Sequence, residues 1–220
     1  MMKKILLALL VLGTTVGTAS AQVEIGIKLS PSVAYLRADA PQQYSFKSEK
    51  SKLGIGGGLV VDYFFGQNYA FGTGLQLTSK GGTVSYQANI VTQDNEQKIS
   101  LQYLEIPLTV KLFTNDITTD TKLYFQLGGK IGGLVAARID GEKFYQSGGE
   151  KSSKHFIIPD AALLGGFGAE YQVGQSTKVF AGLSYHHGLA NVDRYFEKTL
   201  NFNDVSLKNG EVALDLGIKF

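Results

Sequence analysis

The 220-residue chain contains no cysteine and no tryptophan. The lack of cysteine rules out a disulfide framework, and the chain can pass through an oxidising compartment without thiol chemistry. Long apolar runs are missing after residue 21, which excludes spanning helices, since each needs about 20 apolar residues. The formal net charge of +2 comes without a basic run, so nucleic acid is not an expected partner.

Glycine and two aromatic residue types are abundant instead, with 27 Gly, 13 Phe and 11 Tyr. Glycine suits a thin, curved sheet, and aromatic side chains suit the belts that flank a membrane. The length fits one all-β domain.

The first 21 residues have the pattern of a secretory signal. Lys3 and Lys4 give a positive start, residues 5–12 are apolar, and residues 19–21 read Ala-Ser-Ala. The alternative, a short membrane anchor, is disfavoured because the apolar core is too short to span. We therefore expect a signal peptide over 1–21 and a single barrel domain over 22–220, and N-terminal sequencing should show that the mature protein begins at Gln22.

Apolar and polar residues alternate with a period of two in eight segments, which is the pattern of half-buried β-strands. In the last segment, Val212, Leu214 and Leu216 alternate with Glu211 and Asp215. The pattern predicts an all-β fold, a transmembrane antiparallel up-and-down barrel of about eight strands. The predicted strands are 23–35, 54–64, 69–80, 100–113, 122–136, 159–171, 177–189 and 211–220.

The predicted connections alternate between short and long along the chain. Residues 65–68, 114–121 and 172–176 are short, whereas the other connections run to roughly 15 to 20 polar residues, longer than usual in a compact soluble domain. Outer-membrane barrels have short periplasmic turns and long external loops. We therefore expect a multi-pass protein of the outer membrane with both termini in the periplasm.

One face of the strands collects charges and glycines, and the other collects apolar and aromatic residues. An eight-stranded interior is barely wide enough for side chains, so we place the charges inside as neutralising pairs. A soluble barrel would reverse the faces and would have to pack many aromatic rings inside. The aromatic rings that we expect on the outside are those of Tyr35, Tyr63, Tyr69, Phe71, Tyr103, Phe113, Phe125, Tyr171, Tyr185 and Phe220. The predicted lumen network is Glu24, Lys28, Asp62, Glu105, Lys111, Lys130, Glu170, Lys178, Asp215 and Lys219.

The segment from Tyr103 to Lys111, with the sequence YLEIPLTVK, resembles a signature of the PorT-like outer-membrane β-barrel family of Bacteroidetes. The terminal Phe220 resembles the last-strand signal read by the barrel assembly machinery. The resemblance implies an integral outer-membrane barrel that contacts outer-membrane lipid and lipopolysaccharide. Within the segment, Pro107 cannot donate to a strand ladder and predicts a bulge or a locally opened pairing.

Catalytic chemistry has little support in the sequence. Ser184 and His186 share a strand face, as a nucleophile and its base require, but no third group is evident. The three histidines show no metal-ligand spacing, and the glycines at 54–58 lie in a strand, without the helix that phosphate binding uses. We expect no enzyme, cofactor or metal. The leading hypothesis is an anchor presenting four external loops for structural, adhesive or secretion-accessory roles. The alternatives are a narrow passive pore and, less favoured, a lipid-modifying enzyme.

Overall fold

The computed structural model describes residues 23–41, 46–86, 95–145, 150–194, 196 and 204–220. The signal peptide predicted over residues 1–21 lies outside this part of the chain. Among the described residues, no helix has both the length and the apolarity to cross a membrane.

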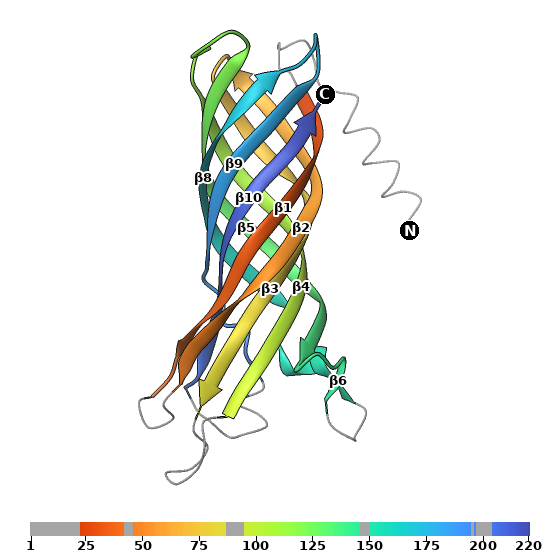
Figure 1. Cartoon of the computed structure of the whole chain (residues 1–220), viewed down its shortest axis with the longest axis vertical. Helices are drawn as coiled ribbons and strands as arrows, with labels where there is room; N and C mark the ends of the chain where they lie inside the picture. Colours follow the sequence, from red (N-terminus) through yellow and green to blue (C-terminus); the bar gives the residue numbers. More distant parts are fainter. Residues whose placement is uncertain (1–22, 42–45, 87–94, 146–149, 195, 197–203) are drawn as a thin grey trace, which may run out of the picture.

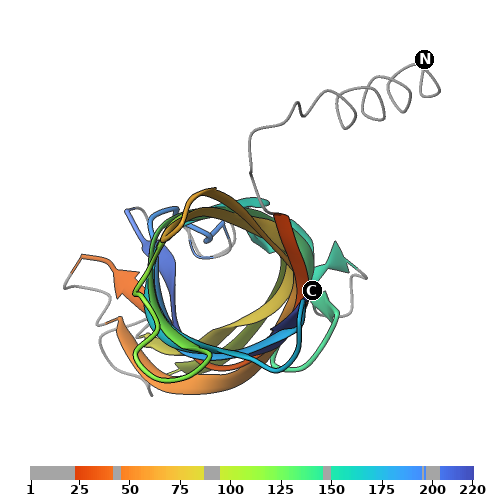
Figure 2. The same cartoon turned by 90° about the horizontal axis from the view of Figure 1, so that it is seen from above.

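Eight strands form a closed antiparallel barrel, which confirms the predicted fold class (Figures 1 and 2). Around the ring the order is β1-β10-β9-β8-β5-β4-β3-β2, and β1 closes the barrel against β10, with Gly26 opposite Lys219. Up-and-down closure leaves no unpaired sheet edge. The strands are β1 (Val23–Asp39), β2 (Lys47–Gly66), β3 (Tyr69–Tyr86), β4 (Asn95–Phe113), β5 (Thr121–Ile139), β8 (Pro159–Gln172), β9 (Lys178–Gly188) and β10 (Ser206–Lys219).

The strands extend further than predicted at the long-loop end. β2 begins at Lys47 instead of 54, and β10 begins at Ser206 instead of 211. As a result, the connections after β1 and β3 cover only residues 40–46 and 87–94, which corrects the expectation of four long loops. The segment 47–52 reads KSEKSK, so it has no apolar alternation by which its strand character could be recognised.

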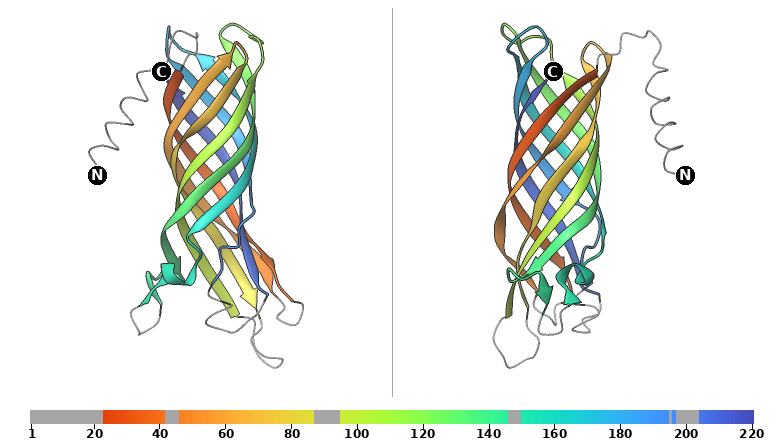
Figure 3. Two further views of the ribbon diagram at one scale, coloured as in Figure 1. Left: turned by 180° about the vertical axis from the view of Figure 1, so that it is seen from behind. Right: turned by 90° about the vertical axis from the view of Figure 1, so that its right-hand side faces the viewer.

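The two remaining connections at this end are long. Residues 140–158 carry a small hairpin, β6 (Phe144–Tyr145) with β7 (Glu150–Lys151), followed by a 3-10 turn, η2 (Ser152–His155). Residues 189–205 join β9 to β10. The short turns, the start of β1 and the chain end lie together at the opposite end of the barrel (Figures 1 and 3).

The outer wall of the barrel is apolar. On β4, Leu104 and Leu112 bound a stripe of outward side chains that are each 42–47% exposed, while Glu105 and Thr109 between them are buried inside. The stripe spans nine residues, the length of a strand that crosses a membrane. An apolar surface of this extent is incompatible with a soluble barrel.

Most of the aromatic rings expected outside do face outward. An outward girdle at the short-turn end consists of Tyr63, Tyr69, Phe71, Phe125, Tyr171 and Phe220. At the other end, the hydroxyls of Tyr35 and Tyr185 lie 3.2 Å apart on the outer wall. The prediction was wrong for Tyr103 and Phe113, which are buried inside because their odd-numbered positions on β4 share the inward face of Glu105.

Pro107 opens the ladder between β3 and β4 without shifting it. Thr73 pairs with Leu108 and Gln76 with Glu105, and Pro107 between them has no partner on β3. The register is the same on both sides of this gap, so of the two expected outcomes the structure shows a locally opened pairing instead of a bulge.

Candidate functional site: the closed barrel interior

Lys219 is the centre of an ion-pair cluster in the short-turn half of the interior. Its Nζ lies 3.2 Å from a carboxylate oxygen of Glu24 and 2.9 Å from one of Asp62, and it also contacts Glu170. Lys219 is 1% exposed, so these contacts are shielded from water. One lysine from the last strand thereby joins carboxylates from β1, β2 and β8.

Two further lysines complete this cluster. Lys111 Nζ lies 2.8 Å from Asp62, and Lys178 pairs with Glu24 at the edge of the interior. We call the six residues Glu24, Asp62, Lys111, Glu170, Lys178 and Lys219 the Lys219 cluster. A separate pair, Lys28 with Asp215 at 3.0 Å, lies further along the interior.

Glu105 is the centre of a second cluster, in the long-loop half. Its carboxylate lies 2.6 Å from Lys80 Nζ and 2.9 Å from Lys130 Nζ, and it accepts a hydrogen bond of 2.7 Å from Thr78. Lys80 also pairs with Asp160 at 2.9 Å.

Lys130 connects this cluster to His186. It pairs with Glu211 at 3.1 Å and contacts His186. We call Lys80, Glu105, Lys130, Asp160, His186 and Glu211 the Glu105 cluster.

The structure brings all ten residues of the predicted lumen network into ion pairs inside the barrel. Sequence reasoning missed four members of the Glu105 cluster: Lys80, Asp160, His186 and Glu211. Lys80 and Glu211 were placed at strand ends, although β3 and β10 continue beyond them. The alternation with Val212 already put Glu211 on the charged face, and period-two counting along β3 puts Lys80 on the face of Gln76 and Thr78, but neither residue was included in the predicted network.

Ser184, His186 and Glu211 have the connectivity of a catalytic triad. His186 Nε2 lies 3.0 Å from Ser184 Oγ, and its Nδ1 lies 2.9 Å from Glu211, the third group that the sequence did not reveal. All three side chains are buried. Lys130 Nζ contacts both His186 Nδ1 and the Glu211 carboxylate. Since a nucleophile needs space for a substrate beside it, this enclosed arrangement fits a structural hydrogen-bond network.

An apolar layer caps the interior at the long-loop end, and a second apolar layer packs against the Lys219 cluster at the short-turn end. At the long-loop end, inward residues of the strands, including Leu36, Leu101 and Tyr103, pack with Phe156 and Val192 of the long connections. At the short-turn end, the layer contains Val60, Ala70, Phe113, Tyr124 and Phe180.

Inward glycines make room for these layers. A Cβ at Gly168 or Gly182 would collide with the Tyr124 phenol, and one at Gly217 would collide with the Phe180 ring. The glycines on the charged face therefore allow aromatic rings to cross an interior of eight strands, which is otherwise just filled by ordinary side chains.

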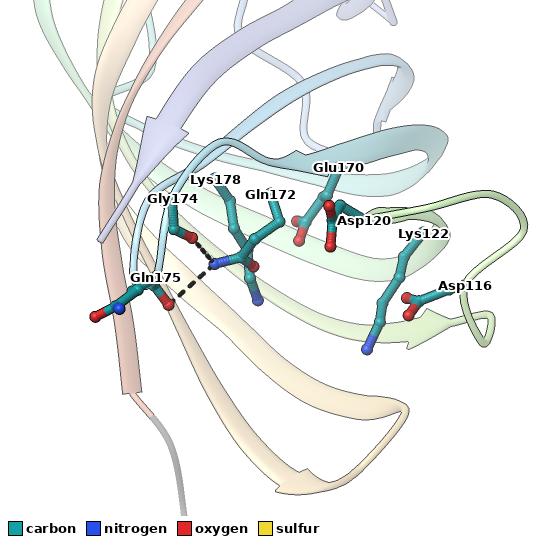
Figure 4. A pocket seen from close by; sticks show the side chains of 8 residues that line it. All are labelled: Asp116, Asp120, Lys122, Glu170, Gln172, Gly174, Gln175 and Lys178. Carbon is teal, nitrogen blue, oxygen red and sulfur yellow. Dashed lines mark hydrogen bonds between the residues drawn. The ribbon is translucent and has the colours of Figure 1, made fainter.

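Between the side chains that the structure describes, little open space remains along the axis. A void of about 30 Å³ in mid-barrel, lined by Lys28, Asp62 and Asp215 among others, has room for one or two waters. A larger pocket of about 420 Å³ opens at the short-turn end (Figure 4). Asp116, Asp120 and Lys122 line one side of it, and it ends at Glu170 and Lys178 of the Lys219 cluster. This pocket is a vestibule that the charged cluster closes.

An apolar outer wall around a closed, charge-paired interior defines an integral membrane β-barrel. Residues 18–194 match the family model described as "Outer membrane protein beta-barrel domain". The chain belongs to this family and is an integral protein of the outer membrane.

Solved structures show the same fold. Neisserial surface protein A (NspA) is 15% identical, with 92% of this chain and 100% of that chain covered and a TM-score of 0.52. OprG from Pseudomonas aeruginosa is 15% identical, with 91% and 96% covered and a TM-score of 0.50. At this identity the likeness concerns the fold alone. The sequence has no match among curated proteins.

Proposed function

We propose that this protein is a non-enzymatic, non-conducting anchor that displays its long connections outside the cell for structural, adhesive or secretion-accessory work. The observation that supports this most is the closed interior, which is filled by two charged clusters and two apolar layers. If nothing passes through the interior, the function depends on the outer surface and the long connections.

The orientation that we propose places both termini in the periplasm and the connections 140–158 and 189–205 outside. The grouping of the three short turns with the start of β1 and the end of β10 supports it, because outer-membrane barrels have short periplasmic turns. The absence of cysteine makes a test simple: in intact cells, an impermeant maleimide should label Asp140→Cys and should not label Ile117→Cys. The reverse pattern would overturn the orientation.

The alternative function, a narrow passive pore, makes the opposite prediction about conductance. We expect purified protein in planar bilayers to show no steady conductance of porin size, because the interior void of about 30 Å³ does not form a channel. A known porin reconstituted in parallel serves as the positive control. Steady channels of porin size would refute the closed interior and favour the pore.

Membership of the PorT-like family and an origin in Bacteroidetes are part of the same proposal. They are supported by the segment from Tyr103 to Lys111, whose two charged residues have structural roles. Glu105 is the centre of one cluster and Lys111 belongs to the other.

We also propose that Phe220 acts during insertion by the barrel assembly machinery. Its ring is outward and 59% exposed, and its backbone pairs with Ile25. Deleting Phe220 should lower membrane yield several-fold and induce periplasmic stress, while protein that does insert should keep its stability. Val173→Ala, which alters an outward apolar residue at the same end, is the control. An unchanged yield without Phe220 would contradict this role.

A further inference from the structure

Three basic residues form a cluster on the outer wall at the long-loop end. Lys52, Lys98 and Arg138 come from β2, β4 and β5, and the positive charges of Lys98 and Arg138 repel the Lys52 ammonium. In the described part of the chain, no carboxylate lies within ion-pair distance of these three. Of the acids on neighbouring parts of these strands, Glu96 pairs with Lys50 at 3.1 Å, and Asp140 accepts the backbone N–H of Lys98.

An irregularity in the wall positions Lys52. The β2–β3 ladder has no pairs between Ser51 opposite Gly82 and Gly57 opposite Leu77. Across this gap, Lys52 Nζ donates to Ser79 Oγ at 3.0 Å and to the carbonyl of Lys80 at 3.4 Å. These two hydrogen bonds hold the Lys52 ammonium against β3.

A polar pocket of about 220 Å³ lies beside these cations. Ser79, Ser100 and Gln102 line it together with Lys52 and Arg138. Ser79 is opposite Gln102, and Ser100 is opposite Arg138, so the hydroxyl, amide and guanidinium groups share the outward face. Such a set of donors and positive charges suits a phosphate group.

The wall becomes apolar immediately beyond this pocket. Gln102 and Leu104 are successive outward residues of β4, about 7 Å apart. Leu104, Ile106 and Ile131 then line an open apolar groove of about 510 Å³, in which Gly132 and Gly133 contribute no side chain. The pocket and the groove together form an amphiphilic surface, with cations at the rim and an apolar channel toward the membrane.

We propose that this surface binds a phosphorylated lipid of the outer leaflet, with its phosphate between Lys52, Lys98 and Arg138 and an acyl chain in the groove. The proposal rests on the proposed orientation, because that orientation places the basic pocket at the outer leaflet. Charge complementarity selects an anionic headgroup, and the adjoining groove selects a lipid over a free phosphate.

The test measures binding of phosphorylated lipid A to the purified full chain in detergent by native mass spectrometry. The variant Lys52→Gln/Lys98→Gln/Arg138→Gln should bind about a hundredfold more weakly, since each basic residue near a lipid surface contributes about fivefold. Lys50→Gln is the matched control, because Lys50 lies on the same rim and is already paired with Glu96. It should change affinity by less than about threefold. Heat-modifiable migration on gels checks that each variant is folded.

The groove is tested by filling it. A Cβ at Gly133 meets nothing within 4 Å, so Gly133→Leu places a side chain in the groove without a clash and should weaken binding about tenfold. Gly165→Leu is the control, because a Cβ there is also outward and in ordinary contact, at 3.9 Å from Leu127, but outside the groove.

Two further binding measurements distinguish a lipid phosphate from free phosphate. Dephosphorylated lipid A should bind the native protein as weakly as phosphorylated lipid A binds the triple variant, and millimolar inorganic phosphate should not displace the lipid. The proposal is overturned if the triple variant binds like the native protein, if Lys50→Gln weakens binding equally, or if inorganic phosphate competes fully. Unchanged binding by Gly133→Leu would overturn the role of the groove. Because the assay uses purified protein, these outcomes are separate from the labelling and conductance tests of the proposed function.

Discussion

Replacing Lys219 with methionine is expected to lower the free energy of unfolding by between about 3 and 5 kcal/mol, because removing one partner leaves buried charge uncompensated. Asp62 keeps Lys111, and Glu24 keeps Lys178, but no other lysine pairs with Glu170 in the described part of the chain. Urea unfolding of the refolded protein in lipid vesicles, followed by heat-modifiable migration, measures the change.

Lys50→Met is the matched control for this substitution. The Lys50 side chain is 67% exposed and pairs with Glu96 on the outside of the barrel, where an ion pair contributes well under 1 kcal/mol. Equal unfolding midpoints for Lys219→Met and the native protein would show that water screens the interior, and would contradict the closed structure.

The second large effect concerns Glu105, which lies between Lys80 and Lys130. Glu105→Ala should destabilise the barrel by about 3 kcal/mol, since it removes a carboxylate shared by two buried lysines and the acceptor of the Thr78 hydroxyl. This loss is near the lower end of the range of about 3 to 5 kcal/mol for breaking a buried ion pair, because Lys80 keeps its contact with Asp160 and Lys130 keeps its contact with Glu211.

Two further variants separate charge from packing at Glu105. Glu105→Gln retains an acceptor for Thr78 and should recover part of the loss, because an amide fills nearly the same space. Glu96→Ala removes an exposed carboxylate from the same strand and should be close to neutral. If Glu105→Ala were also neutral in urea unfolding, the Glu105 cluster would not be a stabilising element.

Much of the outer wall could be predicted because its signal is local. In a strand, successive side chains point to opposite faces, so the alternation of Leu214 and Leu216 with Asp215 already assigns a face to each residue. The prediction failed for Tyr103 and Phe113 because residue type was given more weight than strand position. Both follow the parity of Glu105 and are buried inside.

The strand ends could not be predicted as well. Beyond the apolar wall both faces of a strand are polar, as in residues 47–52, and the period-two signal disappears although the ladder continues. Lys80 and Glu211 stood at the ends of predicted strands, and only the longer strands show that both lie well inside the barrel. The triad-like contact of Ser184, His186 and Glu211 depends on the register between β10 and β9, which places Glu211 opposite His186.

The sequence by itself determined that the protein is a small β-barrel with an apolar exterior and a charged interior, because those properties follow from the alternation along each strand. Only the tertiary structure decided which charges meet. Closure of the barrel, with its particular tilt and stagger, sets the height of each inward residue, and this brings Lys219 to Glu24, Asp62 and Glu170 from three other strands. The lateral pairing of β2, β3, β4 and β5 brings Lys52, Lys98 and Arg138 to one rim, although they are far apart in the chain.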